Sequence, residues 1–174
     1  MTMKLRLRFT AAALGLALAA APHAAPVQYE IDPHHTYPSF EADHLGISVW
    51  RGKLNKTTGH VTVDRAAGTG TLELSIDLAS IDFGHDAMNA WARCKDFFDV
   101  AQHPTATYKG RLTGFANDAP TRVDGELTLH GVTRPVPIHI HSFRCIPHPM
   151  LRTRELCGAD ASATFQRDQF GLDA

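Results

Sequence analysis

The stretch Thr71-Leu72-Glu73-Leu74-Ser75-Ile76-Asp77 alternates strictly between polar and apolar side chains. In an extended chain, this alternation puts three aliphatic side chains on one face and polar side chains on the other. The segments 124–130 (DGELTLH) and 136–141 (VPIHIH) follow the same pattern. A period of two residues predicts β-strands that are buried on one face and hydrated on the other.

Short strands separated by turns extend through most of the chain. Turns are indicated at residues 55–59, 67–70, 117–120 and 131–135, where Gly, Pro, Asn or Asp interrupt the pattern. We predict eight strands near residues 28–31, 39–43, 47–54, 59–63, 70–77, 106–112, 121–130 and 136–144, and a ninth over 157–166. Many short strands of this kind favour an all-β sandwich or barrel.

One segment departs from the strand pattern and predicts a short helix. Residues 85–99 contain no Gly, no Pro and no β-branched residue. Ala87, Trp91 and Phe98 lie at helical spacing, and Asp86 can cap the first turn. The aromatic side chains of this helix either pack into the core or plug the mouth of a barrel and touch a ligand.

The N-terminal residues have the pattern of a secretory signal peptide. Three basic residues among the first eight precede a short apolar run over 9–21, and small residues follow it. The run is shorter than the roughly 20 residues that a bilayer span needs. We therefore expect a signal peptide over 1–25, a single domain over 26–174, and a periplasmic or secreted location.

The charge of the chain argues against some partners. Without the expected signal peptide, 14 Lys and Arg face 18 Asp and Glu. The sequence has no basic stripe, which disfavours nucleic acid as a partner. No later apolar stretch is long enough to cross a membrane as a helix, so no transmembrane segment is expected after signal cleavage.

Three cysteines remain after the signal peptide. Cys145 and Cys157 lie twelve positions apart, and in an exported protein such a pair predicts a disulfide that closes a loop. A bridge over a loop of this length stabilises the fold by about 3 kcal/mol in the chain-entropy model. Cys94 is left over, either as a small buried apolar residue or as a reactive thiol.

Motifs for catalysis are scarce in this sequence. It contains no G-x-S-x-G elbow, no glycine-rich phosphate loop and no H-E-x-x-H pair. His139 and His141 lie on one face of a predicted strand, at a spacing that suits Zn²⁺ or Cu²⁺. A metal-binding protein using these histidines with His34 or His35 is therefore one alternative function. A hydrolase or isomerase acting inside a barrel is another, and it requires perturbed titratable groups there.

The run 127–136 (LTLHGVTRPV) resembles the signature of the YceI-like family of polyisoprenoid-binding proteins. Other segments resemble family motifs in the same order: 29–35 (YEIDPHH), His44 with Gly46 and Gly52, Asp86 with 95–99 (KDFFD) and Pro104, and 157–171. The resemblance covers the chain from the end of the expected signal peptide onward.

This resemblance implies a lipocalin-like antiparallel β-barrel of about eight strands with one short helix, a size that can hold one small ligand. It also implies a non-enzymatic protein without cofactor or metal, whose partner is a long-chain isoprenoid lipid such as a polyprenyl quinone or polyprenol. An apolar tunnel is enough to bind such a tail. We expect the tunnel to be lined by Phe40, Trp50, Trp91, Phe97, Phe98, Tyr108, Leu127, Ile138, Ile140 and Phe165.

Two features differ from the family pattern. The helical segment keeps only Asp86 of the family's R-D-x-H-L start, so head-group recognition by that motif is not carried over. The sequence also stops at residue 174, where relatives usually continue with a closing strand. We therefore expect a truncated C-terminal strand and an unpaired barrel edge. A strand of a second protomer filling that edge, in a homodimer, is a hypothesis.

Overall fold

The computed structural model describes residues 25–173. Its strands are β1 (Val27–Glu30), β2 (Ser39–His44), β3 (Ser48–Leu54), β4 (Thr57–Asp64), β5 (Thr69–Asp77), β6 (Ile81–Asp82), β7 (Thr105–Thr113), β8 (Arg122–Leu129), β9 (Val132–Pro135), β10 (Ile138–Pro147) and β11 (Glu155–Ser162). The helices are α1 (Asp86–Arg93) and the 3₁₀ turns η1 (Leu78–Ser80) and η2 (Arg167–Phe170). The predicted signal peptide, apart from its last residue, lies outside the described residues.

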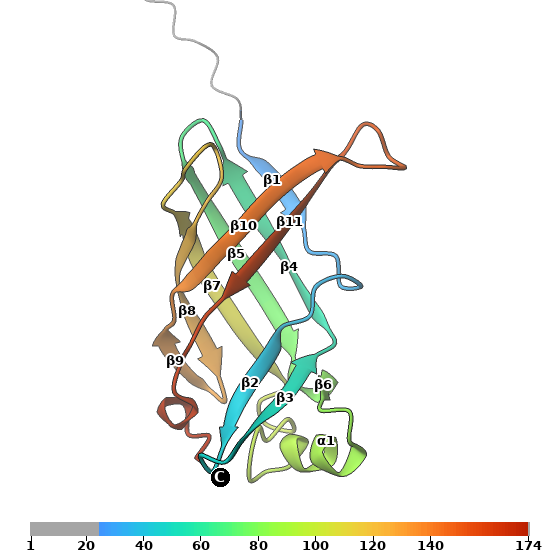
Figure 1. Cartoon of the computed structure of the whole chain (residues 1–174), viewed down its shortest axis with the longest axis vertical. Helices are drawn as coiled ribbons and strands as arrows, with labels where there is room; N and C mark the ends of the chain where they lie inside the picture. Colours follow the sequence, from blue (N-terminus) through green and yellow to red (C-terminus); the bar gives the residue numbers. More distant parts are fainter. Residues whose placement is uncertain (1–24, 174) are drawn as a thin grey trace, which may run out of the picture.

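Eight of the strands form one antiparallel and strongly curled sheet (Figure 1). They follow the order β1-β4-β5-β7-β8-β10-β11, and β9 pairs with β8 away from this path. Among the described residues, the edge strands β1 and β11 do not pair with each other. The sheet is therefore a half-barrel with an open seam between β1 and β11, and the predicted all-β barrel class with one short helix is confirmed.

The central strands β5, β7 and β8 separate apolar and polar side chains completely. Their inward positions are Leu72, Leu74, Ile76, Ala106, Tyr108, Gly110, Leu112, Val123, Gly125, Leu127 and Leu129, which lie opposite one another in register. Outward positions carry charges, and Lys109 pairs with Glu73 at 3.4 Å. The Tyr108 hydroxyl donates to the Val136 carbonyl at 2.8 Å, so the inward phenol has a partner. The alternation in the sequence thus sets which face becomes the core.

Three glycines allow neighbouring strands of this sheet to approach closely. Gly59 has φ +146°, and a Cβ added there would lie 2.0 Å from the Glu73 carbonyl oxygen. Gly110 and Gly125 face each other across β7 and β8, and a Cβ on Gly125 would lie 2.7 Å from the Gly110 Cα. Any side chain at these positions would push the neighbouring strand away, so glycine permits the close approach.

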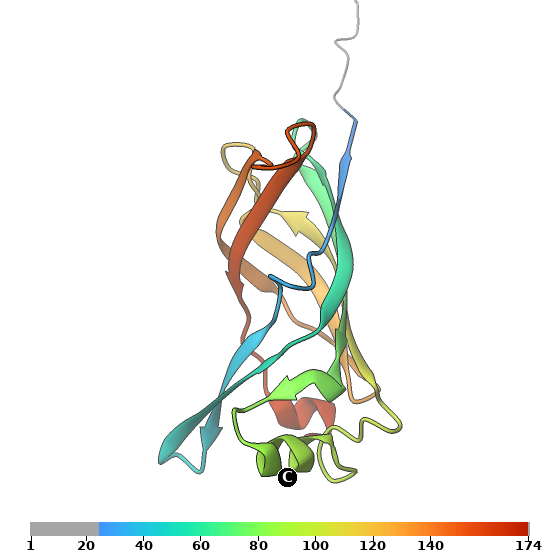
Figure 2. The same cartoon turned by 90° about the vertical axis from the view of Figure 1, so that its right-hand side faces the viewer.

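A small second sheet and α1 lie at one end of the half-barrel (Figure 2). This sheet has the order β2-β3-β6. The core of this end includes Leu78, Ile81 and Ala92, which are 0–1% exposed. Phe170 of η2 is fully buried, and its carbonyl lies 3.3 Å from the His130 ring. These contacts fill the end of the half-barrel with side chains.

The predicted turn over residues 131–135 is wrong. Val132–Pro135 forms β9, and the turn is made by the two preceding residues, His130 and Gly131. Both have positive φ, at 51° and 74°. A two-residue turn of this kind matches the twist of a hairpin, so β9 can pair with β8 at once.

The helix is shorter than predicted and begins with a different cap. It ends at Arg93 instead of extending through residues 85–99. His85 is the N-cap, since its Nδ1 accepts from the Met88 N–H at 3.3 Å. Asp86, the predicted cap, lies in the first turn, where a carboxylate still favours the helix dipole. No helix among residues 25–173 has both the length and the apolar character of a membrane span.

Candidate ligand-binding site

The candidate site is the concave face of the half-barrel, by which we mean the inward side chains of its strands. In the middle of this face, Val61 on β4 lies opposite Leu72 on β5, and both are half-buried. Leu74, the next inward residue of β5, is half-buried as well. The neighbouring Val63 and Ile76 are at most 9% exposed. Apolar surface is therefore left uncovered in the middle of the face.

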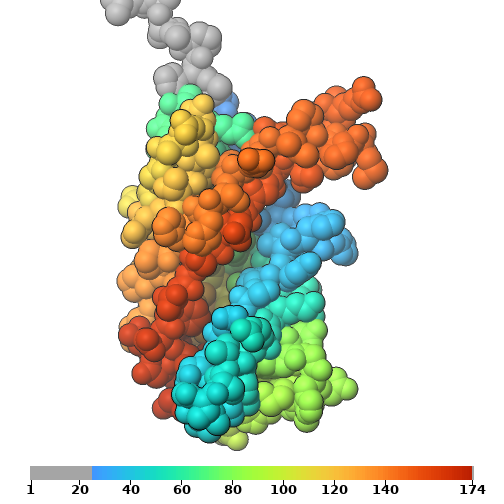
Figure 3. Space-filling view, in the orientation of Figure 1, coloured from blue at the N-terminus to red at the C-terminus, as the bar shows by residue number. Residues whose placement is uncertain are grey.

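The seam side of the concave face is even more open. Ala159 and Ala161 of β11 pair with Phe143 and Ile140 of β10, and both alanines are exposed. The Phe143 side chain opposite Ala159 is half-buried and packs against the core. The surface is hollowed between β11 and the chain segment that follows β1 (Figure 3). An elongated apolar ligand could reach the concave face from this side.

The structure places the ten predicted lining residues in three groups. Four lie on the concave face (Tyr108, Leu127, Ile138, Ile140), two on the small sheet (Phe40, Trp50), and four around α1 and η2 (Trp91, Phe97, Phe98, Phe165). Four of the ten are packed in the core at 4–9% exposure: Phe98, Tyr108, Leu127 and Ile140. The other six are half-buried or exposed and offer surface without any rearrangement.

An aromatic group lies at the small sheet, and two of its members, Phe40 and Phe83, line a hollow. Phe83 meets Phe40 edge-on at 5.4 Å and Trp50 at 6.2 Å between ring centroids, and His44 stacks on Trp50 at 4.2 Å. The hollow has a volume of about 500 Å³ and is lined by Ser39, Phe40, Glu41, Arg51, Gly52, Lys53, Asp82, Phe83 and Gly84. Its lining therefore combines aromatic side chains with charged ones.

A second aromatic group belongs to α1 and the segment after it. Trp91 stacks on Phe97 at 4.7 Å, and Phe97 contacts Phe98 at 4.8 Å. Trp91 is 37% exposed, whereas Phe98 is 8% exposed. Phe165, 43% exposed, meets the buried ring of Phe170 at 5.3 Å. This end of the molecule carries core aromatics and exposed aromatics side by side.

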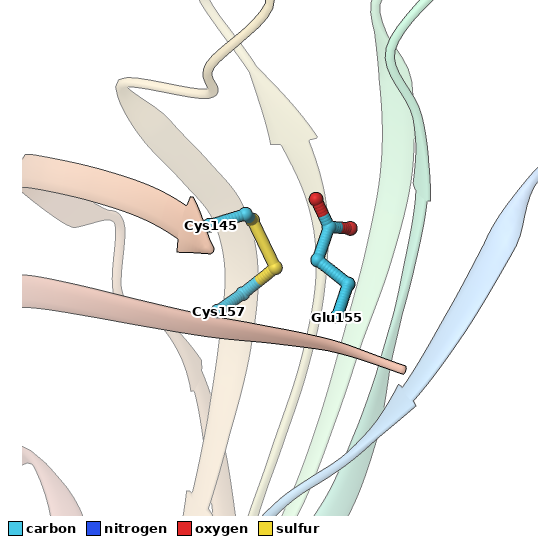
Figure 4. Close-up of side chains that lie close together, drawn as sticks. All are labelled: Cys145, Glu155 and Cys157. Carbon is cyan, nitrogen blue, oxygen red and sulfur yellow. A yellow bond between two sulfur atoms is a disulfide. The ribbon is translucent and has the colours of Figure 1, made fainter. Parts of the chain in front are cut away.

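The seam is bridged at one point by a polar cluster that the sequence did not predict. Arg65, just after β4, approaches Glu155 of β11 at 3.1 Å and the Tyr29 hydroxyl of β1 at 3.3 Å. The Tyr29 hydroxyl donates to Glu155 at 2.5 Å. Arg65 also lies 2.8 Å from Sγ of Cys145, which forms a disulfide with Cys157 (Figure 4). We call Tyr29, Arg65 and Glu155 the seam cluster.

The seam cluster changes the acidity of its members. Hydrogen bonds from Tyr29 and Arg65 hold the pKa of Glu155 below its ordinary value. Burial, followed by the hydrogen bond to Glu155, raises the pKa of Tyr29. The cluster therefore consists of an ionised carboxylate, a guanidinium and a neutral phenol at neutral pH. Because Arg65 and Glu155 are both more than one-third exposed, this link across the seam is weak.

Among residues 25–173, one group of metal-ligating residue types lies close together, around the disulfide. Ligand atoms of Cys145, Glu155 and Cys157 lie within 4.8 Å of one another. The two sulfurs are bonded to each other, and Arg65 occupies the carboxylate, so this group is a disulfide beside an ion pair. The alternative pair, His139 and His141, stacks at 5.3 Å on the exposed side of β10, while Ile140 between them is buried.

The concave face offers little for catalysis. Among the inward positions of β5, β7 and β8, Tyr108 carries the single ionisable group. Burial raises its pKa to about 12, so it is neutral at physiological pH. Its hydroxyl donates to a backbone carbonyl and is not free to act on a ligand. Burial is the largest cause of this shift, and the charge of Asp124 adds to it. No acid–base pair forms on these three strands.

Several residues of the site were missing from the predicted lining set. Leu72 and Leu74 alternate clearly in the sequence, and this alternation could have identified them as inward. Ala159 and Phe143 follow no clean alternation, because a register shift interrupts β10 between Ile140 and Ser142. The members of the seam cluster are 36 to 126 residues apart in sequence, so local pattern carries no signal for them.

Comparisons with known proteins place this chain in a family. The YceI-like domain family matches residues 29–174. A UPF0312 protein of Pseudomonas aeruginosa strain LESB58 is 32% identical over 171 residues, covering 97% of this chain and 88% of that protein.

A solved structure supports the fold. BcnA of Burkholderia cenocepacia superposes with a TM-score of 0.58 at 22% identity, covering 79% of this chain and 81% of BcnA. A polyisoprenoid-binding domain from Saccharophagus degradans, implicated in plant cell wall breakdown, covers 67% of this chain and 74% of that domain at 20% identity, with a TM-score of 0.41. That value is too low to extend its ligand to this chain. From the matched domain and the similarity in sequence, the chain belongs to the YceI-like domain family.

Proposed function

We propose that this protein binds and carries a long-chain isoprenoid lipid, a polyprenyl quinone or polyprenol, in the periplasm or outside the cell, without catalysing a reaction on it. The observation that carries the proposal is the uncovered apolar surface in the middle of the concave face, beside an open seam. Val61, Leu72, Leu74 and Phe143 provide this surface. An isoprenoid tail is elongated and apolar, and it fits a face of this kind.

The energetics of apolar burial make such binding feasible. A tail that removes about 300 Å² of its own surface from water gains roughly 7 kcal/mol before the entropic cost of association. Few polar contacts are then needed for affinity, and the polar groups near the mouth would select the head group. The disulfide between Cys145 and Cys157 supports an oxidising compartment.

A pair of variants on one strand tests the site. Ala159→Phe would place a large ring on the concave side of β11, where it competes with the ligand for space. Asp160→Phe adds the same ring to the opposite face of the strand and is the matched control. We expect Ala159→Phe to weaken binding of a polyprenyl alcohol at least about tenfold in a fluorescence titration, with little effect of the control. Equal binding by both variants would place the ligand elsewhere.

A further inference from the structure

The turn between β10 and β11 presents apolar side chains to solvent. Met150 is 85% exposed and Leu151 is 49% exposed, and Ile146 behind them is 52% exposed. The hairpin projects freely from the half-barrel in the space-filling view (Figure 3). We call residues 146–154 the basic tip. A group of exposed aliphatic side chains at the end of a projecting loop can mark a surface that another molecule covers.

The charge of the basic tip has a single sign. Arg152 and Arg154 are exposed within it, and Arg144 is exposed just before it. From residue 142 to residue 154 the sequence has no Asp or Glu. None of these three arginines forms an ion pair with a described residue, whereas the chain as a whole has a formal net charge of −1. The tip is therefore a local cationic surface on a slightly acidic protein.

The basic tip is also held in one conformation. The His148 N–H donates to the Arg154 carbonyl at 2.9 Å, and the Arg154 N–H donates to the Leu151 carbonyl at 2.8 Å. His148 Nδ1 accepts from the Met150 and Leu151 N–H groups at 3.2 and 3.1 Å. The disulfide between Cys145 and Cys157 joins the two strands behind the turn. A preorganised tip loses little conformational entropy when it enters another surface.

We propose that the basic tip docks the protein onto a bilayer of anionic phospholipid. Met150 and Leu151 would enter the apolar boundary of the membrane, and the arginines would contact the phosphate groups. This inference rests on the proposed function and extends it, since a carrier must take up its lipid from a membrane. Tyr29 and Arg65 of the seam cluster lie beside the disulfide, so docking would bring one end of the seam close to the bilayer.

The opposite hairpin supplies a matched control. Leu45 and Ile47, at the turn between β2 and β3, are each 80% exposed. They lie at the other end of the molecule from the basic tip (Figure 1). Asp43 lies two residues before Leu45 and is acidic. Its carboxylate accepts from the Gly46 N–H at 2.9 Å. This hairpin thus exposes as much apolar surface without the arginines.

Co-sedimentation with vesicles tests the proposal. The protein with its disulfide intact is mixed with vesicles of phosphatidylglycerol and phosphatidylcholine, or of phosphatidylcholine alone. We expect the anionic vesicles to bind at least about tenfold more tightly, with binding that falls as salt rises. Met150→Ser with Leu151→Ser, and separately Arg152→Gln with Arg154→Gln, should each weaken binding about tenfold or more. Leu45→Ser with Ile47→Ser should leave it unchanged.

Two readouts separate this proposal from the proposed function and from other occupants. Ala159→Phe, which should lose the lipid cargo, should still bind anionic vesicles as the parent protein does. Met150→Ser with Leu151→Ser should still carry cargo when measured by native mass spectrometry. Equal binding of both tip variants and the parent protein would overturn the membrane proposal. The membrane proposal would also be overturned if the parent protein did not bind vesicles and sedimentation velocity showed a dimer that is lost in Met150→Ser with Leu151→Ser.

Discussion

The central strands and the terminal hairpin of the half-barrel belong to one sheet but differ in burial. On β5, β7 and β8, inward side chains such as Val123 and Leu127 are 1% and 9% exposed. On β11, the inward Ala159 and Ala161 are exposed. The difference arises because the central strands have neighbours on both sides, whereas β11 is an edge of the sheet.

This contrast separates stability from binding within a single sheet. Most inward side chains of the central strands form the core and are covered by one another, whereas Leu72 and Leu74 of β5 remain half-buried. The hairpin of β10 and β11 is held by a disulfide and a polar contact across the seam, and it leaves apolar surface open. A lipid-binding face needs such a region, because surface that the protein has already covered cannot bind a ligand.

The largest effect should come from truncating a central side chain. Leu127→Ala removes a buried side chain from the middle of the core and should lower the free energy of unfolding by roughly 2–5 kcal/mol. Ile146→Ala, at a side chain that is 52% exposed on the hairpin, should cost less than about 1 kcal/mol. Urea denaturation measures both. Similar losses in the two variants would contradict the division into core and open hairpin.

Removing the disulfide should have the next largest effect. Cys145→Ser with Cys157→Ser reopens a loop of twelve residues and should destabilise the protein by about 3 kcal/mol. We expect the loss to appear in thermal unfolding, and hydrogen exchange should rise more in β10 and β11 than in β5. Uniform exchange throughout the sheet would mean that the hairpin and the central strands do not open separately.

Tyr108→Phe tests a single hydrogen bond of the central strands. It removes the hydroxyl that donates to the Val136 carbonyl at 2.8 Å and leaves that carbonyl without this partner. We expect a loss of about 1–1.5 kcal/mol in the free energy of unfolding by chemical denaturation. Because the phenol is already neutral below its raised pKa of about 12, the loss should be the same at pH 6 and pH 8. A loss that changed with pH in this range would contradict a purely structural role.

The seam cluster should have the smallest effect, and it should depend on pH. The pKa of Glu155 is lowered in the folded protein, so its contribution is present above its ordinary pKa of about 4.5 and disappears as pH falls through the lowered value. Since Glu155 and Arg65 are partly exposed, we expect less than about 1 kcal/mol. Glu155→Gln should therefore be less stable than the parent protein near neutral pH and equally stable in acid. A constant difference at all pH values would exclude the ion pair as the cause.

The sequence predicts the central strands well because their environment is simple. Residues 71–77 alternate cleanly, and each side chain faces either the core or water. The hairpin β8–β9 was harder to predict, because its turn uses His130 in a conformation that favours glycine. Gly131, Arg134 and Pro135 indicate a turn in the sequence, but residues 132–135 pair with β8 and form a strand.

The candidate site was predicted less completely, for two physical reasons. The expected lining contains several large aromatic side chains, but the sequence does not show which of them the core covers: Phe98 and Tyr108 are 8% and 4% exposed, whereas Phe165 is 43% exposed. The opening itself depends on which strands become edges, and this is a property of topology. The link from Arg65 to Glu155 spans 90 residues and depends on that topology too. Alternation identified the apolar face, but it could not identify the part of the face that stays uncovered.

Native mass spectrometry of the protein purified from its own compartment, followed by organic extraction, tests lipid carriage most directly. We predict a stoichiometric adduct whose extract contains a polyprenyl quinone or polyprenol, and we predict its loss in Ala159→Phe but not in Asp160→Phe. A protein that carries no lipid, or one that carries a metal ion in its place, would contradict the proposal.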